Sequence, residues 1–210
     1  FAPGYDVIAR FQGGPNAGHT LYVGDKKIVL HQIPSGIFHE EKTNLIGGGV
    51  VLDAVTLKKE CENVAAFGVD YRKNMYISER THLILPTHRA IDKASELAKG
   101  NEKIGSTLKG IGPAYMDKTG RNGLRVGDVL SKDFNEKYNR IKEKHLQILS
   151  HYEHQVDWQE WETQFFAAVE FLRTLQIVNG EYWLDNHLKA GKKVLAEGAQ
   201  GSMLDIDFGT

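Results

Sequence analysis

The sequence predicts an α/β fold in which flanking helices cover a central mixed sheet and a mainly helical insertion interrupts the sheet. Two observations predict this class. Residues 44–52 form an apolar, β-branched run that is followed by Asp53 as a helix N-cap and by a helix over residues 54–67. Residues 192–197 return to a strand after a long stretch of helical periodicity. Strands that alternate with helices are typical of a sheet layered with helices.

The first hundred residues contain most of the predicted strands, each of which is a short run of apolar and β-branched residues. These runs cover residues 5–11, the two arms of a hairpin within 21–30, 44–52, 75–78 and 82–85. A second helix is predicted from Pro86 to about Lys99, since proline is favoured in the first turn of a helix.

The region after Asp128 has helical periodicity instead. Apolar and aromatic residues recur at three- and four-residue steps and predict two amphipathic helices packed as an antiparallel pair. The first stripe contains Phe134, Tyr138, Ile141, His145, Leu149 and Tyr152, and the second contains Trp158, Trp161, Phe165, Val169 and Leu172. Such stripes are typical of a core and not of a cofactor site. A further helical turn is expected at residues 184–188. The chain therefore divides into an α/β part (1–99), a mainly helical insertion (100–190) and a return to the sheet (191–210).

Composition restricts the function. The 210 residues carry a formal net charge of −1, which argues against a broad nucleic-acid-binding surface. The single cysteine, Cys61, cannot form an intrachain disulfide, so we expect a reducing compartment. No run approaches the roughly twenty apolar residues of a membrane span.

Three glycine-rich loops carry polar groups that suit a ligand. The first, residues 12–20, ends a strand and contains Asn16 and His19, which offer an amide and an imidazole. The second, residues 104–113, combines two hydroxyls and a lysine, which suit a phosphate, although it is not a Walker A motif. The third, residues 197–202, places Glu197 and Gln200 at a strand end. An ordinary turn is the alternative for each loop taken alone.

Other polar residues are weaker candidates. Arg121 lies on a turn, where an exposed or ion-paired arginine is the commoner role. His82 and His88 flank a strand end and a helix start, so core or surface roles are favoured. His151 and His154 are three residues apart but lack companions at metal-ligand spacing.

Six motifs in order resemble the adenylosuccinate synthetase family over essentially the whole chain. They are residues 11–20, 33–37, 46–52, 109–115, 123–128 and 197–207. The resemblance implies a P-loop-NTPase-like synthetase fold, here incomplete, in a cytoplasmic enzyme of AMP biosynthesis. Such an enzyme uses GTP and Mg²⁺ to phosphorylate the 6-oxygen of IMP, and L-aspartate then displaces the phosphate to give adenylosuccinate.

The resemblance also implies roles for individual residues. His19 matches the general acid, and the backbone carbonyl of Gly18 matches a magnesium ligand. Residues that match IMP contacts are Asn16, Ala17, Gly18, His19, Thr107, Arg121 and Gln200, and those that match GTP contacts are Gly18, His19 and Thr20. Arg121 resembles an arginine that reaches the IMP phosphate of the neighbouring subunit, which implies a homodimer.

The sequence departs from the family pattern in two ways. The glycine-rich phosphate loop that precedes these motifs in the family, and the aspartate- and guanine-binding segments that follow them, are absent, so we expect a fragment that binds IMP weakly and has no activity alone. Within the matched part, Pro15, Ser106, Leu108 and Lys109 replace commoner residues, and Leu108 restricts a position where glycine is usual. A noncatalytic nucleotide-binding module and a different GTP-dependent enzyme are the alternatives.

Overall fold

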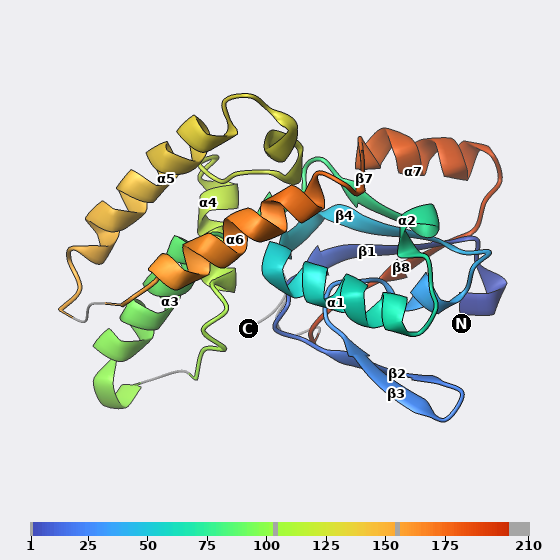
Figure 1. Ribbon diagram of the computed structural model, residues 1–210, viewed down its shortest axis with the longest axis horizontal. Coiled ribbons are helices and arrows are strands. Elements are labelled where there is room, and N and C mark those ends of the chain that lie inside the picture. The colour runs from blue at the N-terminus through green and yellow to red at the C-terminus, as the bar shows by residue number, and fades with distance from the viewer. Residues whose placement is uncertain (1, 103–104, 154–155, 202–210) are drawn as a thin grey trace.

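The computed structural model describes residues 2–102, 105–153 and 156–201, and its centre is a parallel six-stranded sheet (Figure 1). Five strands follow the order β7-β5-β4-β1-β8, and β6 pairs with β4 beyond this path. The strands are β1 (Val7–Gly13), β4 (Thr43–Leu52), β5 (Met75–Ser78), β6 (His82–Leu83), β7 (Gln176–Val178) and β8 (Val194–Glu197). The predicted α/β class is confirmed, whereas the sheet was predicted to be mixed and all its described pairings are parallel.

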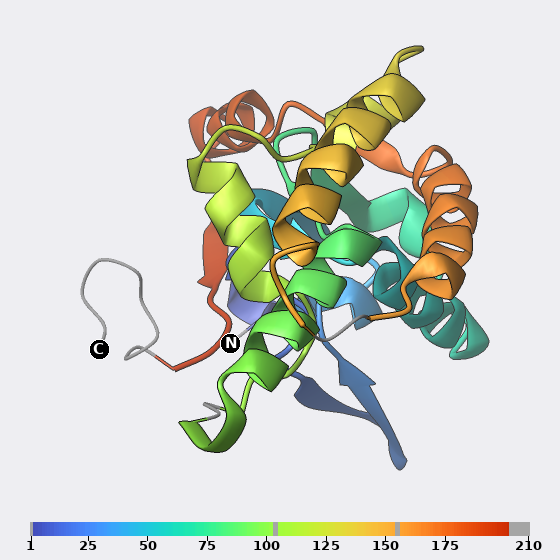
Figure 2. The same cartoon turned by 90° about the vertical axis from the view of Figure 1, so that its left-hand side faces the viewer.

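A separate antiparallel hairpin carries the end of the first glycine-rich loop. Strands β2 (His19–Val23) and β3 (Lys26–Leu30) extend away from the main sheet in both ribbon views (Figures 1 and 2). The hairpin was predicted within residues 21–30, but it begins earlier, at His19. Because β1 continues to Gly13, the loop predicted over residues 12–20 shrinks to 14–18.

Helices cover the sheet and gather at one end of the molecule, where α3, α4 and α5 lie together (Figure 2). The α-helices are α1 (Ala54–Ala66), α2 (Tyr71–Asn74), α3 (Pro86–Ala98), α4 (Ile111–Thr119), α5 (Phe134–Leu149), α6 (Gln159–Leu172) and α7 (Gly180–Lys189). Short 3₁₀ helices occupy Ala2–Gly4, Ser35–Phe38, Gly100–Glu102 and Val126–Leu130. Asp53 caps α1 as predicted, since its carboxylate accepts hydrogen bonds from the backbone N–H groups of Val55 and Thr56. Within the described ranges, no helix is both long and apolar enough to cross a membrane.

The two predicted amphipathic helices meet through aromatic side chains. Tyr138 of α5 stacks on Phe165 of α6 with ring centroids 5.6 Å apart, and its hydroxyl donates to Glu162 at 2.8 Å. Tyr138 and Phe165 are both buried, and they join a core that extends to α1 and the sheet. The central residues of both stripes are therefore core, as the sequence predicts, whereas the stripe residues nearest the connection between the helices are only partly buried: Leu149, Tyr152, Trp158 and Trp161.

Strand β7 was not predicted. It is three residues long and half-buried, and it pairs in parallel with β5 at the edge of the main sheet. It falls within the range predicted as a mainly helical insertion (100–190), so that range contributes a strand to the sheet. The division at residues 100 and 190 stays a prediction.

The order in which strands are added to the sheet reverses direction at β1. From β1 the chain adds β4 and β5 on one side, and β8 later returns to the opposite side of β1. Ligands of open α/β sheets bind outside the carboxyl ends of strands at such a reversal of direction. The ends of β1 and β8 are therefore the place in this sheet where a ligand site is expected.

The close approach of β1 to β4 requires glycine at position 49. A Cβ atom there would overlap the backbone carbonyl oxygen of Phe11, at the point where the register between the strands shifts. We expect Gly49→Ala to lower the free energy of unfolding by about 2 kcal/mol, because backbone cannot yield as a flexible side chain does. Urea unfolding measures this. The matched control is Gly48→Ala, whose Cβ would meet side-chain atoms and no backbone: the Glu181 carboxylate at 3.2 Å, Cβ of Arg80 at 3.4 Å and Oγ of Ser78 at 3.5 Å. An equal loss in both variants would contradict the argument.

Candidate functional site

A cavity of about 330 Å³ lies where the sheet topology predicts a ligand site. It brings together four residues that the sequence singled out, Ala17, Gly18, His19 and Gln200, from segments about 180 positions apart. Arg10, Leu21, Ser35, Glu197, Gly198 and Ala199 complete its lining. The first and third glycine-rich loops therefore form one site.

An ion pair between buried Arg10 and half-buried Glu197 lines this cavity. Arg10 of β1 and Glu197 of β8 are direct partners in the parallel register, and the guanidinium Nη1 lies 3.6 Å from the carboxylate Oε1. Arg10 is only 2% exposed. Ser35 holds the other oxygen of Glu197, donating from its backbone N–H at 2.8 Å and from its hydroxyl at 2.5 Å. A buried charge without a partner is costly, so this pairing keeps both charges in the site.

His19 lies at the start of β2 against this ion pair. Its Nδ1 lies 3.4 Å from Nη1 of Arg10. Burial is the main cause that lowers the pKa of His19; the carboxylate of Glu197 acts in the opposite direction without cancelling it, and Arg10 and His31 lower the pKa further. His19 is therefore a neutral imidazole at pH 7 in this structure.

The cavity contains several buried polar atoms that make no hydrogen bond within the described part of the chain. They are Nε of Arg10, Nε2 of His19 and Oε1 of Glu197. Buried polar groups are almost always paired, and exceptions in natural proteins call for a functional explanation. Nε of Arg10 and Nε2 of His19 could therefore donate to a polar ligand, whereas Oε1 of Glu197 faces Nη1 of Arg10 at 3.6 Å.

Gln200 connects the two loops directly. Its side-chain amide donates to the Oδ1 atom of Asn16 at 3.0 Å, and the Gln12 amide donates to the Ala199 carbonyl at 2.7 Å. Gln200 has a φ angle of 73°, a left-handed conformation that is uncommon for a residue with a side chain. Such strain is frequent at ligand sites, and the predicted roles of Asn16 and Gln200 stay predictions. Residues 202–207 of the same predicted motif lie outside the described residues.

Thr107, predicted as a phosphate contact, lies on an exposed loop and does not line this cavity. Carboxylates of α3 occupy the donors of this loop: Glu96 accepts from the backbone of Gly105 at 2.7 Å, and Asp92 accepts from the hydroxyl of Ser106 at 2.6 Å. Leu108 has a φ angle of 55°, which explains why glycine suits this position. Ile104, the first residue of the predicted loop, lies outside the described residues.

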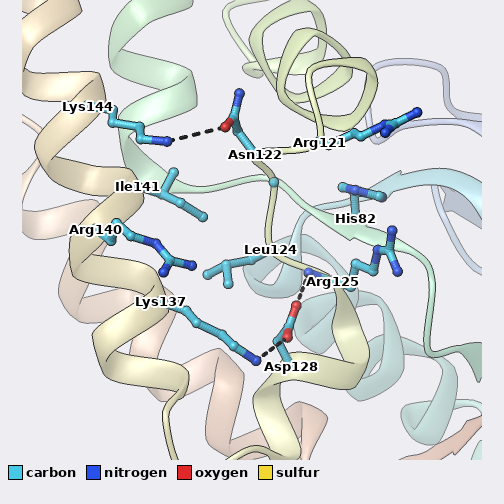
Figure 3. A pocket seen from close by; sticks show the side chains of 11 residues that line it. His82, Arg121, Asn122, Leu124, Arg125, Asp128, Lys137, Arg140, Ile141 and Lys144 are labelled. Atoms are coloured by element: carbon cyan, nitrogen blue, oxygen red, sulfur yellow. Dashed lines mark hydrogen bonds and ion pairs between the residues drawn. The ribbon is translucent and has the colours of Figure 1, made fainter.

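Arg121 is exposed and lies in a second, larger cavity of about 540 Å³ between the turn after α4 and the helix α5 (Figure 3). This cavity is strongly basic: the cations that line it are Arg121, Arg125, Lys137, Arg140 and Lys144, and Asp128 is its carboxylate. Arg121 has a φ angle of 58°. Thr20, the remaining predicted GTP contact, is an exposed residue of β2.

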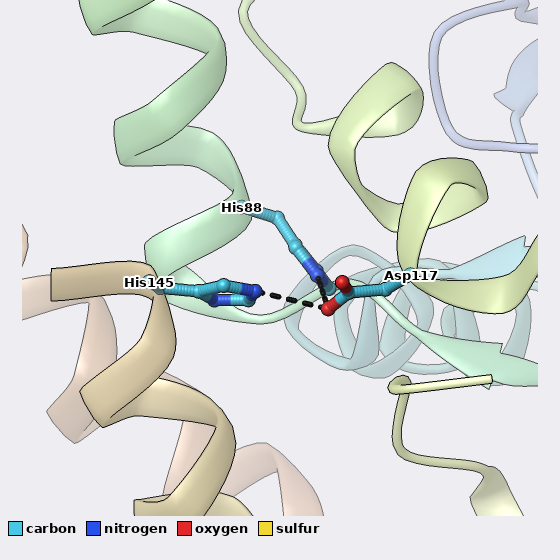
Figure 4. Close-up of side chains that lie close together, drawn as sticks. All are labelled: His88, Asp117 and His145. Atoms are coloured by element: carbon cyan, nitrogen blue, oxygen red, sulfur yellow. Dashed lines mark hydrogen bonds and ion pairs between the residues drawn. The ribbon is translucent and has the colours of Figure 1, made fainter. Parts of the chain in front are cut away.

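A cluster of His88, Asp117 and His145 has the composition of a metal site but is hydrogen-bonded as a structural one (Figure 4). The Oδ2 atom of Asp117 lies 2.9 Å from Nε2 of both histidines. The backbone N–H of Leu85 donates to Nδ1 of His88, which leaves the proton of the neutral ring on Nε2, the atom that a metal would need unprotonated. The cluster therefore joins α3, α4 and α5. Burial alone would raise the pKa of Asp117, but the bonds from His145 and His88 hold that pKa well below its usual range.

The sequence interpretation gave no role to Arg10 or Ser35, and it noted Glu197 only as a strand-end residue. A charged residue inside the apolar run 5–11 is the one signal that could have indicated Arg10.

The family model for adenylosuccinate synthetase matches residues 1–210. The chain belongs to the adenylosuccinate synthetase family. Adenylosuccinate synthetases of Christiangramia forsetii and Cytophaga hutchinsonii are 56% and 54% identical to it over 208 and 211 residues. These matches cover 98% and 100% of this chain but 49% of each relative, so the chain spans about half the length of the curated relatives it matches.

A solved structure supports the same family, and a second shows the same fold. The fully ligated adenylosuccinate synthetase of Plasmodium falciparum has a TM-score of 0.87 and 33% identity, over 99% of this chain and 48% of that one. The succinoaminodeoxyadenylate synthetase of cyanophage S-2L has a TM-score of 0.61 at 21% identity, over 99% of this chain and 47% of that one, and shows a likeness of fold alone.

Proposed function

We propose that this chain forms the IMP-facing part of an enzyme that makes adenylosuccinate from IMP, L-aspartate and GTP in AMP biosynthesis. In the first step the 6-oxygen of IMP attacks the γ-phosphorus of GTP, which gives 6-phosphoryl-IMP and GDP. In the second the amine of L-aspartate attacks C6 of the purine and releases phosphate. Family membership supports the ligase class, and the cavity at the ends of β1 and β8 supports the location.

The observation that carries this proposal is that His19 and Gln200 line one cavity, in which buried polar atoms make no hydrogen bond to the described residues. In the proposed site Gln200 and Asn16 hold the purine, with Ala17 and Gly18 beside them. His19 donates a proton or a hydrogen bond where negative charge develops during phosphoryl transfer. Gly18, His19 and Thr20 contact GTP.

The residues present are compatible with Mg²⁺. Gly18 lines the cavity and offers a backbone carbonyl oxygen, a hard ligand of the kind that Mg²⁺ prefers, and substrate phosphates and waters commonly supply most of the other ligands of Mg²⁺. When bound, Mg²⁺ would neutralise charge on the nucleotide phosphates. Glu197 is already engaged with Ser35 and Arg10, so we assign the ion to Gly18 alone.

Arg121 enters the proposal through a second copy of the protein. Its side chain makes no hydrogen bond or ion pair to any described residue, it is exposed, and its backbone is strained. We propose a homodimer in which Arg121 contacts the IMP phosphate of the neighbouring subunit, while Thr107 contacts the phosphate from its own subunit. Both assignments require the loops to reach a ligand beyond the cavity described above.

Loss of Arg121 should weaken IMP binding. We expect Arg121→Leu in the full-length protein to raise the KM for IMP about tenfold or more with a smaller change in kcat, because a charge-assisted hydrogen bond to phosphate is lost. Leucine leaves the backbone strain in place. Arg140→Leu, in the same basic cavity but on α5, is the matched control and should leave this KM unchanged. A normal KM for Arg121→Leu in a confirmed dimer would contradict the assignment.

Substrate omission tests the function itself. Phosphate release by the full-length protein should require IMP, GTP and L-aspartate together, and removal of any one should abolish it. Release of phosphate from GTP without IMP would contradict the proposal.

A further inference from the structure

The contact between Arg10 and His19 determines which nitrogen of the histidine carries the proton. Arginine has only N–H donors and stays protonated in proteins, so a hydrogen bond from its Nη1 requires an acceptor. The partner atom is Nδ1 of His19, at 3.4 Å. Nδ1 must therefore be the unprotonated nitrogen, and the proton of the neutral ring lies on Nε2.

We propose that Arg10 is a positioning residue that fixes this tautomer, so that His19 presents Nε2–H to the ligand as a hydrogen-bond donor. The proposal rests on the proposed function for the identity of the ligand, an oxygen of the transferring phosphoryl group. The choice of donor atom does not depend on that identity.

Strand pairing holds Arg10 in place for this role. Its register partner Glu197 lies 3.6 Å away on β8, and Ser35 anchors that carboxylate with two hydrogen bonds. Arg10 is buried, so its guanidinium cannot turn to solvent. A series of side-chain contacts thus runs from the 3₁₀ helix through both strands of the main sheet to the hairpin; its members are Ser35, Glu197, Arg10 and His19.

The surroundings of Nε2 are those of a hydrogen-bond donor that a ligand could use. The atom is buried and makes no hydrogen bond to any described residue. A buried N–H without a partner is unfavourable, and a ligand oxygen that reached it would complete the bond. A donor already oriented before the reaction needs no reorganisation when charge develops.

The positive charge of Arg10 lies on the Nδ1 side of the His19 ring, away from Nε2. Arg10 faces it from β1, Glu197 from β8 and His31 from the end of β3. Burial, Arg10 and His31 lower the pKa of His19, and Glu197 raises it less. His19 thus acts as a neutral donor in front of the Arg10 cation, so the reaction needs no imidazolium.

Histidine nitrogen NMR tests the tautomer without any ligand. The full-length protein would be labelled with ¹⁵N-histidine, and His19 assigned by its absence from the His19→Asn spectrum. We expect Nδ1 of His19 to show the shift of an unprotonated nitrogen and Nε2 that of a protonated one at pH 7.5. A proton on Nδ1 in the wild-type protein would overturn the proposal.

Two variants test whether Arg10 and Glu197 act on His19, because they are expected to change the pKa of His19 in opposite directions. Arg10→Met should raise the pKa of His19, because a nearby cation is lost, whereas Glu197→Gln should lower it. Arg10→Met should also reduce kcat about tenfold while KM for IMP stays within about twofold, and Arg10→Lys, which still carries only donors, should recover part of kcat. If Arg10→Met does not fold, the wild-type spectrum and Glu197→Gln decide.

The outcomes separate this proposal from the proposed function. An Nδ1–H tautomer together with IMP-dependent phosphate release would reject the role of Arg10 alone. An Nε2–H tautomer without that activity would reject the proposed function alone.

Discussion

Replacement of His19 by asparagine should reduce kcat of the full-length enzyme about a hundredfold or more, while KM for IMP stays within about twofold. The reason is that, in the proposed site, the donor at Nε2 acts where charge develops in the transition state, whereas the hydrogen-bonded pair Asn16 and Gln200 is assigned to hold the nucleotide. Steady-state phosphate release at saturating GTP and L-aspartate measures both constants.

The control for this variant is His151→Asn, at an exposed histidine outside the cavity. It should leave kcat and KM unchanged. If kcat and KM of His19→Asn were both unchanged, His19 would have no part in the chemistry. If KM rose about a hundredfold while kcat stayed unchanged, His19 would be a binding residue only.

Acid should destabilise the chain through His82. Burial lowers the pKa of this side chain to about 4, with further lowering by the cations of Lys118 and Arg125. Between pH 6.5 and 4 the unfolded chain therefore binds a proton at His82 that the folded chain does not, and the free energy of unfolding falls as pH falls. A shift of that size corresponds to about 3 kcal/mol, fully lost once the pH lies below the folded-state pKa.

A matched variant isolates this contribution from other titrating groups. Gly123 packs against the His82 ring, so His82→Gln is expected to be less stable than the wild type at pH 7. The difference in unfolding free energy between wild type and His82→Gln should shrink by about 3 kcal/mol from pH 7 to pH 4 in urea titrations. A constant difference would show that His82 does not titrate with folding.

The sequence predicted an element correctly where the signal for that element lies within its own residues. Asp53 before the helix α1 and the aromatic stripes of α5 and α6 are such patterns, because capping and helical periodicity are short-range properties. Strand β7 was missed because three half-buried residues carry no periodic signal, and only pairing with β5 makes them a strand.

The candidate site was predictable in part for the same reason. Glycine and polar residues after β1 and β8 indicated two loops, and the family resemblance joined them at Gln200. Arg10 was not predictable, because its burial depends on the register with Glu197, which lies 187 residues away along the chain. Register between distant strands cannot be read from local pattern.

The second glycine-rich loop, residues 104–113, was predicted as a phosphate site, but its polar groups are used within the fold. Its hydroxyls, amides and lysine suit a phosphate, but Asp92 and Glu96 of α3 accept several of the hydrogen bonds that a phosphate would need. That competition arises from tertiary packing. The cluster of His88, Asp117 and His145 likewise joins three helices and has no signature in any one of them.

The central claim is that IMP binds in the cavity between the loops of β1 and β8. Amide NMR of the ¹⁵N-labelled 210-residue chain during IMP titration tests it directly. We expect weak, saturable shifts at Ala17, Gly18, His19 and Gln200 and at their cavity neighbours. Shifts confined to the basic cavity around Arg125, Arg140 and Lys144, or no saturable shifts at all, would contradict the account.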